Sequence, residues 1–467
     1  MERKLNRKII AGMAPLILGV APLCSQQPVR PNIVFILADD LGWKDLGCYG
    51  NKHYETPVLD ALAKSGIKYS QAYAACPVSS PTRASIMTGK YPARLKLTNF
   101  IAGNRTDDAS PVLPAEWKPY LEAREVTIAE MLKKQGYSTG MVGKWHLGGA
   151  DSIAPWNQGF DYARMIGKNG LDYYNYSIYL DSYKNEFTDH GTEYLTDKLT
   201  EYGVEFIEKN KKKPFFLYLA YSATHVGIIP RGDKLMKYFF KYNQSEEKFN
   251  PYYSAMVESI DDGVGRIIET LKEVAALENT LIIFTSDNGG LGLDELGPTP
   301  TSILPLRKWK GHVYEGGIRV PAIMSWHGKI EPGSVSDDYF SSIDYLPTLC
   351  SITGINKLPG NVDGTSILPI ITGKGKAGEE RPLFWHYPHF SNQLGRPAGA
   401  VRAGDYKLVE SYETGKVELY NLGNDISESI DLSGEMEQQT RNLHNLLREW
   451  RHQVNANMPL PNADYLQ

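Results

Sequence analysis

Short, continuous apolar runs that alternate with helix-like segments constrain the fold of this chain most strongly. Such runs are typical of strands that are buried on both faces, as in a parallel sheet. Asn32 to Leu37 is such a run, Phe215 to Ala220 and Thr280 to Thr285 are two more candidates for buried strands, and Tyr137 to Val142 is a further expected strand. Their alternation with helices predicts an α/β domain with a mostly parallel central sheet that helices flank.

The intervening segments carry helix signals. Thr56 stands before a proline as an N-cap, and Gly66 is placed to end the helix. Thr127 and Glu130 have the spacing of a capping box. The stretch 252–274 is helical in pattern. These signals place helices between the predicted strands.

The pattern changes after about Gly375. Short strand-like stretches follow there: Ala400 to Ala403, Tyr406 to Val409 and Val417 to Tyr420. A last helix is expected over about 435–454, with apolar residues on one face. We therefore predict a large catalytic α/β domain over 30–375 and a smaller C-terminal α+β subdomain with an antiparallel sheet over 376–467.

The N-terminus predicts export. Four basic residues and one acidic residue in 1–8 precede a mostly apolar run over 9–23. This is typical of a signal peptide, here 1–25, and the run is too short for a membrane span. Cys24 leaves a lipid anchor open as an alternative, although Leu23 is not the small residue that a lipoprotein signal has before its cysteine. The expected location is the periplasm or cell surface of a bacterium.

Charge and cysteine content narrow the class of protein. The net charge is only −4, which gives no sign of a nucleic-acid partner. The four cysteines, Cys24, Cys48, Cys76 and Cys350, form neither a disulfide framework nor a zinc-ligand spacing.

Polar clusters follow the predicted strands. They are Asp39-Asp40, Lys144-Trp145-His146, Thr224-His225 and Asp287-Asn288. Sites in open α/β sheets form beyond the carboxyl ends of the strands, so these side chains are expected on one rim.

The oxygen donors among them predict a metal site. Asp39, Asp40, Asp287 and Asn288 offer only hard oxygen ligands, which suit calcium or magnesium better than zinc. An Asp-Asp pair alone could equally cap a helix or stay solvated. The acid–amide pair at a second strand end favours the metal.

The segment 76–94 is a more specific indication of function than the polar clusters. Its Ser79-Ser80-Pro81-Thr82-Arg83 string precedes a helical stretch and Thr88-Gly89. A serine-rich turn could be a mere N-cap. The longer string resembles the sulfatase signature, in which a cysteine or serine is followed by x-Pro-x-Arg.

Other segments extend this resemblance to the arylsulfatase A-like sulfatases of the alkaline phosphatase superfamily. In order along the chain, from Pro31 to about Leu432, they are ADDLGWKDLGCYG, the signature, VGKWHLG, SDNGG, KGHVYEGGIRVP, GDYKL and ELYNL. The order and spacing of these segments carry the resemblance, since no short motif decides it alone.

The resemblance implies that the first signature residue becomes formylglycine (3-oxoalanine). Counting back from Pro81 and Arg83 places it at Ser79, because Ser80 is one residue late and Cys76 does not have Pro and Arg at the required distances. This is the serine-type bacterial variant. It implies a serine-type maturation enzyme as a partner.

The resemblance also assigns the remaining roles. Calcium would be bound by Asp39, Asp40, Asp287, Asn288 and an oxygen of modified Ser79. The sulfate would be held by Arg83, Lys144 and Lys310. His225 would protonate the leaving alcohol, and His146 would act as the base that releases sulfate. Lys308 could be confused with Lys310, which stands directly before the Gly-x-x-Tyr-Glu-Gly-Gly run.

Substrate contacts are expected from the rim and the C-terminal subdomain. The candidates are Lys90, which could also order the nucleophile's surroundings, Arg105, His312, His386 and His389. Such residues suit a sulfated carbohydrate, although they could equally just pack the two domains together. Two other functions stay open: a phosphohydrolase of the same superfamily, and a catalytically silent glycan-binding protein.

Overall fold

The computed structural model describes residues 30–167, 172–293, 300–375 and 381–465. The predicted signal segment 1–25, with Cys24, lies outside these ranges. Within them, no helix combines the length and the apolar character that a bilayer span requires.

The large sheet has eleven strands in the order β11-β2-β10-β9-β1-β8-β4-β5-β6-β7, with β12 paired to β2. Its strands are β1 (Asn32–Ala38), β2 (Ile67–Tyr73), β4 (Ser138–Gly143), β5 (Tyr162–Ile166), β6 (Asn175–Leu180), β7 (Glu186–His190), β8 (Phe215–Ala220), β9 (Thr280–Ser286), β10 (Arg319–Trp326), β11 (Ser334–Ser336) and β12 (Phe340–Ser341). The four predicted strands are β1, β4, β8 and β9, and they pair in parallel at its centre. The prediction of a mostly parallel central sheet is confirmed.

Antiparallel strands extend this centre on both sides. β10 runs antiparallel to both β9 and β2, and β5, β6 and β7 form an antiparallel series beyond β4. The sequence pattern did not predict β2, β5, β6 and β7, because each of them includes exposed or partly exposed positions and none forms a continuous apolar run.

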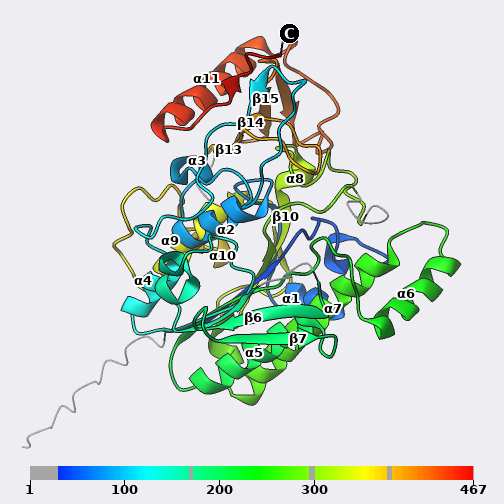
Figure 1. Cartoon of the computed structure of the whole chain (residues 1–467), viewed down its shortest axis with the longest axis vertical. Helices are drawn as coiled ribbons and strands as arrows, with labels where there is room; N and C mark the ends of the chain where they lie inside the picture. The colour runs from blue at the N-terminus through cyan, green and yellow to red at the C-terminus, as the bar shows by residue number, and fades with distance from the viewer. Residues whose placement is uncertain (1–29, 168–171, 294–299, 376–380, 466–467) are drawn as a thin grey trace, which may run out of the picture.

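Helices cover both faces of the large sheet (Figure 1). The main ones are α1 (Pro57–Ser65), α2 (Ser79–Thr88), α4 (Ile128–Lys134), α5 (Leu195–Asn210), α6 (Gly232–Gln244), α7 (Pro251–Glu273) and α9 (Tyr345–Ile352). Shorter helices are α3 (Pro92–Leu95), α8 (Glu315–Ile318) and α10 (Leu368–Ile371).

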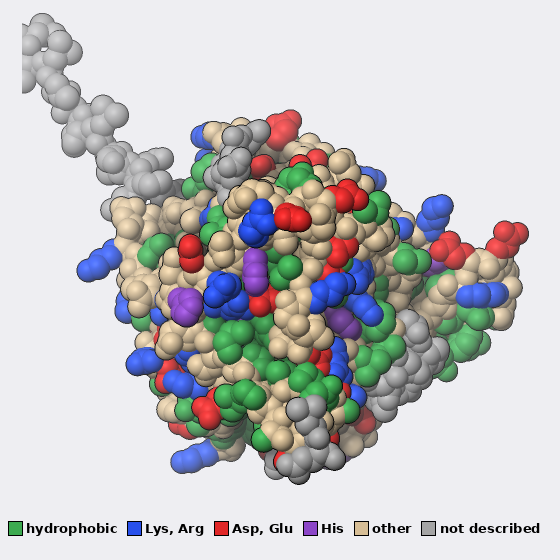
Figure 2. Space-filling view, turned by 90° about the horizontal axis from the view of Figure 1, so that it is seen from above, with side chains coloured by type: hydrophobic (Ala, Val, Ile, Leu, Met, Phe, Trp, Pro, Cys, Tyr) green, Lys and Arg blue, Asp and Glu red, His purple; other side chains and the backbone are tan. Residues whose placement is uncertain are grey.

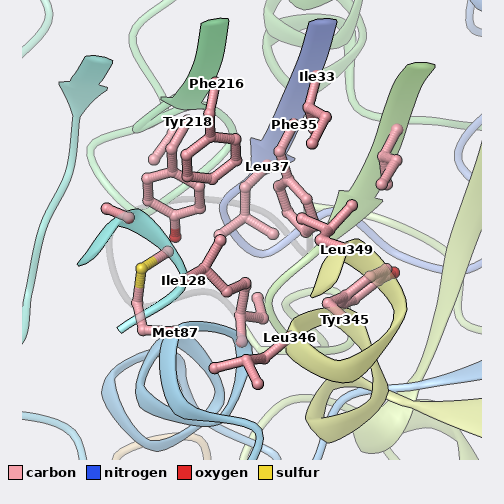
Figure 3. Packing of buried hydrophobic residues seen from close by; sticks show 14 of the residues in the cluster. Ile33, Phe35, Leu37, Met87, Ile128, Phe216, Tyr218, Tyr345, Leu346 and Leu349 are labelled. Carbon is pink, nitrogen blue, oxygen red and sulfur yellow. The ribbon is translucent and has the colours of Figure 1, made fainter. Parts of the chain in front are cut away.

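The two faces of β1 serve two separate cores. Val34 and Ile36 pack with α1, α5 and α7. Ile33, Phe35 and Leu37 pack on the opposite face, where Figure 3 shows them above α2 and α9. This double burial explains why the strand is continuously apolar.

The C-terminal part forms its own antiparallel sheet, as predicted. Its strands are β13 (Leu383–Tyr387), β14 (Ala398–Ala403), β15 (Tyr406–Ser411) and β16 (Val417–Asn421), and α11 (Glu437–Gln453) packs across them. The ring of Trp450 stacks on Phe384 at 4.7 Å. A two-stranded sheet joins β3 (Val112–Leu113) to β17 (Leu460–Pro461).

The structure contains the predicted helices, with one difference in how they are capped. The Thr127–Glu130 capping box is present. α1 begins directly after Thr56, but the Thr56 side chain makes no cap. Instead, the carboxylate of Asp261 on α7 accepts the amide hydrogens of Val58 and Leu59 at 3.0 and 2.7 Å.

Candidate active site

The carboxyl ends of β1, β4, β8 and β9 meet at one rim, as the strand order requires. Backbone hydrogen bonds join the loops there: Asp39 N donates to Ala223 O at 2.9 Å, and Thr224 N donates to Asp39 O at 2.7 Å. Asp40 and His146 have φ values of 62° and 58°, in the left-handed region. These sharp turns direct the chain out of the sheet immediately after each strand.

Ser79 begins α2 and lies at the centre of the rim. Its Oγ is 3.2 Å from both Asp39 Oδ1 and Asn288 Oδ1, and the residue is buried. The neighbouring Ser80 points elsewhere, since its Oγ accepts the Ile101 amide hydrogen at 3.0 Å. Burial raises the pKa of the Cys76 thiol, so it is a buried thiol and not a thiolate. The hydroxyl that reaches the carboxylates is therefore that of Ser79.

Three buried carboxylates, those of Asp39, Asp40 and Asp287, lie at this rim. Burial, and then repulsion from Asp39, raises the pKa of Asp287 to about 6. Burial also raises the pKa of Asp40, against the opposing charge of Lys310. Asn288 Nδ2 donates to Asp40 Oδ1 at 2.7 Å. Negative charge is thus concentrated at one point.

Two lysines lie against these carboxylates. Lys310 Nζ is 2.7 Å from Asp40 Oδ2, and Lys144 pairs with Asp39. Although burial alone would raise it, Lys144 and then His225 and Arg83 hold the pKa of Asp39 well below its usual range. Lys308, the alternative to Lys310, is exposed and lies over the Trp309 ring.

Arg83 is fully buried and turned toward Asp287. Its Nε and one terminal nitrogen donate to Asp287 Oδ2 at 2.9 and 2.7 Å, and the other terminal nitrogen donates to Lys144 O at 2.9 Å. The structure therefore makes Arg83 a positioning group for Asp287 and the Lys144 loop, whereas the sequence predicted it among the groups that hold the sulfate.

Two histidines complete the cluster. His225 Nε2 lies 3.7 Å from Asp40 Oδ2, and candidate ligand atoms of Asp39, Asp40 and His225 lie within 4.8 Å of one another. Burial, and then Lys144, lowers the pKa of both His146 and His225 well below the usual range. Burial therefore favours the neutral form of both rings.

These groups line a cavity of about 660 Å³. Ser79, Lys144, His146, His225 and Lys310 all face it. A site that takes an anionic ligand needs cations and neutral donors, and these side chains supply both.

The predicted substrate-contacting residues do not join this cluster. Lys90 follows the far end of α2 and pairs with Glu125 at 2.6 Å, and Arg105 is exposed. Both nitrogens of His386 are used internally, by Tyr412 and by Asn457 O. His389 is buried against Thr98, and buried His312 contacts Trp309 O at 3.2 Å. The buried positions of His312, His386 and His389 favour the packing alternative over contact with a substrate.

Sequence reasoning did not assign several residues that shape the site. Asp45 joins the loop after β1 to α7 and to Thr301. Met165, Tyr179 and Tyr183 line the cavity from β5, β6 and the turn after β6. Asp45 stands in a segment that was quoted for the resemblance, so a signal was present, whereas the two tyrosines lie in no such segment.

Known proteins that resemble this chain in sequence indicate the family to which it belongs. The family model described as "Sulfatase" matches residues 31–355, and the one described as "N-sulphoglucosamine sulphohydrolase, C-terminal" matches 308–453. A "Sulfatase" of Formosa agariphila is 33% identical, with 91% of this chain and 90% of that protein aligned. An N-acetylgalactosamine-6-sulfatase of Canis lupus familiaris is 32% identical over 90% of this chain and 79% of its own length.

Solved structures agree with these matches. The structure described as Ps i-CgsB in complex with k-i-k-neocarrahexaose has a TM-score of 0.77 and 30% identity, and covers 90% of this chain and 92% of its own. A phosphonate monoester hydrolase of Agrobacterium radiobacter shares the fold at a TM-score of 0.62 and 19% identity. With the rim of Ser79, carboxylates, lysines and histidines in place, these matches establish that the chain is an enzyme of the sulfatase family.

Proposed function

We propose that this sulfatase hydrolyses a sulfate ester of a carbohydrate, with Ser79 converted to formylglycine and with a bound calcium ion. The observation that carries the proposal is the position of the Ser79 hydroxyl, 3.2 Å from both Asp39 Oδ1 and Asn288 Oδ1 at the floor of the cavity. The formylglycine hydrate would supply a nucleophilic hydroxyl and a second hydroxyl on the same carbon.

The donor set fits a calcium ion. The residues that would hold it are Asp39, Asp40, Asp287, Asn288 and modified Ser79. All of these side chains are buried and present oxygen atoms. Burial, and then repulsion from Asp39, raises the pKa of Asp40 and Asp287, and a divalent cation would favour their charged forms. Calcium would lower the pKa of a bound hydroxyl and neutralise charge on the sulfate.

The lysines and the histidines would have separate roles in the reaction. Lys144 and Lys310 face the cavity and can hold the sulfate oxygens as charge develops on them. His225 would protonate the leaving alcohol. Burial, and then the charges of Lys144 and Lys310, lowers the pKa of its ring, and a sulfate anion between the two lysines would offset those charges. His146 would take up a proton on the side of Ser79.

The relatives support a sugar as the rest of the substrate. One relative is named for a sulfated amino sugar, and one structural neighbour is described with a bound neocarrahexaose. A chain that acts on such molecules outside the cytoplasm fits the proposed export signal over 1–25.

The test is activity of protein coexpressed with a serine-type maturation enzyme, assayed on a panel of sulfated and phosphorylated sugars. We expect sulfate release, loss of activity with a calcium chelator, recovery with calcium, and a Ser79 peptide that is lighter by two hydrogens in mass spectrometry. Ser79→Ala should lower kcat at least roughly a thousandfold.

Ser80→Ala is the matched control, because Ser80 Oγ is bound to the Ile101 amide and does not face the carboxylates. It should keep most of the activity. Turnover of phosphate esters alone, or full activity of the Ser79→Ala variant, would overturn the proposal.

A further inference from the structure

The active-site cavity continues beyond its charged floor to an aromatic wall. The floor holds Ser79, Lys144, His146, His225 and Lys310. The wall holds Met165, Ile166, Tyr179 and Tyr183. β5 runs parallel to β4, so Ile166 at its carboxyl end lies on the same rim as Lys144.

Contacts among the side chains of the wall hold them in place without a ligand. Met165 and Tyr179 are direct partners in the β5–β6 register, so their side chains stand on the same face of the sheet. The Tyr179 and Tyr183 rings meet edge to face, with centroids 4.9 Å apart and an interplanar angle of 82°. Trp156 supports Tyr183 in the same way, at 4.9 Å. The rings therefore present a fixed, half-buried apolar surface to the cavity.

The described residues of the wall supply no cation to a second anion. Among the described residues that line the cavity, those that carry or can gain a positive charge are Lys144, His146, His225 and Lys310. All four belong to the floor, beside Ser79. A second sulfate or a carboxylate pressed against the wall would meet only the neutral hydroxyl donors of Tyr179 and Tyr183, and burial of a charge without an opposite charge is costly.

We propose that Tyr179 and Tyr183 select a substrate whose sulfated sugar ring packs an apolar face on them and bears no second anionic group. This inference rests on the proposed function, since the floor must hold the sulfate. A sugar ring has one face of C–H groups, which suits an aromatic side chain. The cavity volume of about 660 Å³ lies in the range of small-ligand pockets.

Substrate comparison gives the first test. The monosulfated isomers of galactose and N-acetylgalactosamine are assayed first, and the isomer that is cleaved is then compared with its counterpart that carries one more sulfate on the same ring. We expect kcat/KM for the disulfated sugar to be lower by at least about tenfold. Equal or faster cleavage of the disulfated sugar would overturn the inference.

Variants of the wall give the second test. Tyr179→Ala and Tyr183→Ala should raise KM for the monosulfated sugar by about tenfold with a smaller change in kcat. Tyr183→Phe keeps the ring and should restore KM. Tyr252→Ala is the matched control, because Tyr252 is 40% exposed at the start of α7 and does not line this cavity. Unchanged KM in both alanine variants would also overturn the inference.

Binding separates this inference from the proposed function. Protein with unmodified Ser79 is titrated calorimetrically with the same monosulfated and disulfated sugars, so that no turnover is needed. Weaker binding of the disulfated sugar supports the wall as a selector. If the matured enzyme cleaves no sulfate ester, the proposed function is wrong. If it cleaves the monosulfated and disulfated sugars equally well, only the inference about Tyr179 and Tyr183 is wrong.

Discussion

Asp45 lies outside the charged floor of the cavity, yet it holds the loop that carries Asp39 and Asp40. Its carboxylate accepts the Gly42 amide hydrogen at 2.7 Å and the Tyr253 hydroxyl hydrogen at 2.6 Å, and it also accepts from Thr301. Tyr253 is on α7, and Thr301 lies in the segment that leads to Lys310. One buried side chain thus fixes three parts of the rim to one another.

Ionisation of Asp45 should make stability depend on pH. Burial raises the pKa of Asp45 to about 6, despite these hydrogen bonds. The folded state then binds the proton more tightly than the unfolded state, so the free energy of unfolding falls as pH rises from the ordinary carboxyl pKa through about 6. Two pKa units correspond to about 3 kcal/mol.

Asp45→Asn removes this titration and keeps the shape of the side chain. We expect its free energy of unfolding, relative to the unsubstituted protein, to rise by about 3 kcal/mol between pH 4 and pH 7. Denaturant unfolding at a series of pH values measures the difference. A difference that does not change with pH would contradict the raised pKa.

At the scale of elements, α1 begins where the sequence predicted, but a different residue caps its first amide groups. The sequence predicted Thr56 as the N-cap, and the helix does begin at Pro57. The Thr56 hydroxyl is instead used by Gly47 N and Asp60. The free amides of α1 are satisfied from α7, more than 200 residues later in the chain, by Asp261.

Asp261→Ala should therefore cost about 2 kcal/mol of unfolding free energy, because it leaves two buried amide groups without acceptors. Asp262→Ala is the matched control. Asp262 is 49% exposed and pairs with Lys234, so its loss should cost less than about 1 kcal/mol. Equal losses in the two variants would argue against capping by Asp261.

At the scale of the whole molecule, a buried cluster of charges joins the two sheets. Lys407 of β15 lies 2.8 Å from Glu315 and 2.9 Å from Glu428. Glu315 also pairs with Arg319 of β10 at 2.6 Å. Although burial alone would raise it, Lys407 and Arg319 hold the pKa of Glu315 well below its usual range.

Lys407→Met would leave Glu428 buried without its cation and Glu315 with Arg319 alone. We expect the free energy of unfolding to fall by about 3–5 kcal/mol. Lys416→Met is the control, because Lys416 is exposed and pairs with Glu418 at the surface, so its loss should change stability by at most about 1 kcal/mol. Adding Glu428→Gln to Lys407→Met should recover part of the loss. Denaturant unfolding of the purified variants decides among these outcomes.

The surface around these interior clusters is mixed in charge. Figure 2 shows basic and acidic side chains interspersed over the face seen from above, with hydrophobic side chains between them. This agrees with the small net charge of −4.

Much of the site could be predicted from the sequence, because its residues stand directly after strands that the sequence pattern identifies. β1, β8 and β9 are buried along their whole length, and β4 is buried except at Ser138. The residues that follow them must share one rim once the strands pair in parallel. The order of the motifs along the chain then indicated the family.

Other features depended on contacts between distant parts of the chain. β6 has buried and exposed residues without a clear period, so its aromatic wall was not predicted. His386 and His389 looked suited to a sugar, but both are buried, and internal contacts use both ring nitrogens of His386 and Nε2 of His389. No local pattern distinguishes a satisfied buried histidine from one that faces a cavity.

The sequence by itself determined the α/β architecture, the family and the set of polar residues at the strand ends, since periodicity and motif spacing are local properties. Only the tertiary structure decided which side chains face the cavity. It turned Arg83 toward Asp287, and it brought Lys144, Lys310 and Tyr179 to the lining of one cavity. Those choices depend on distances across the fold, which are set when the sheet and its two covering layers pack together.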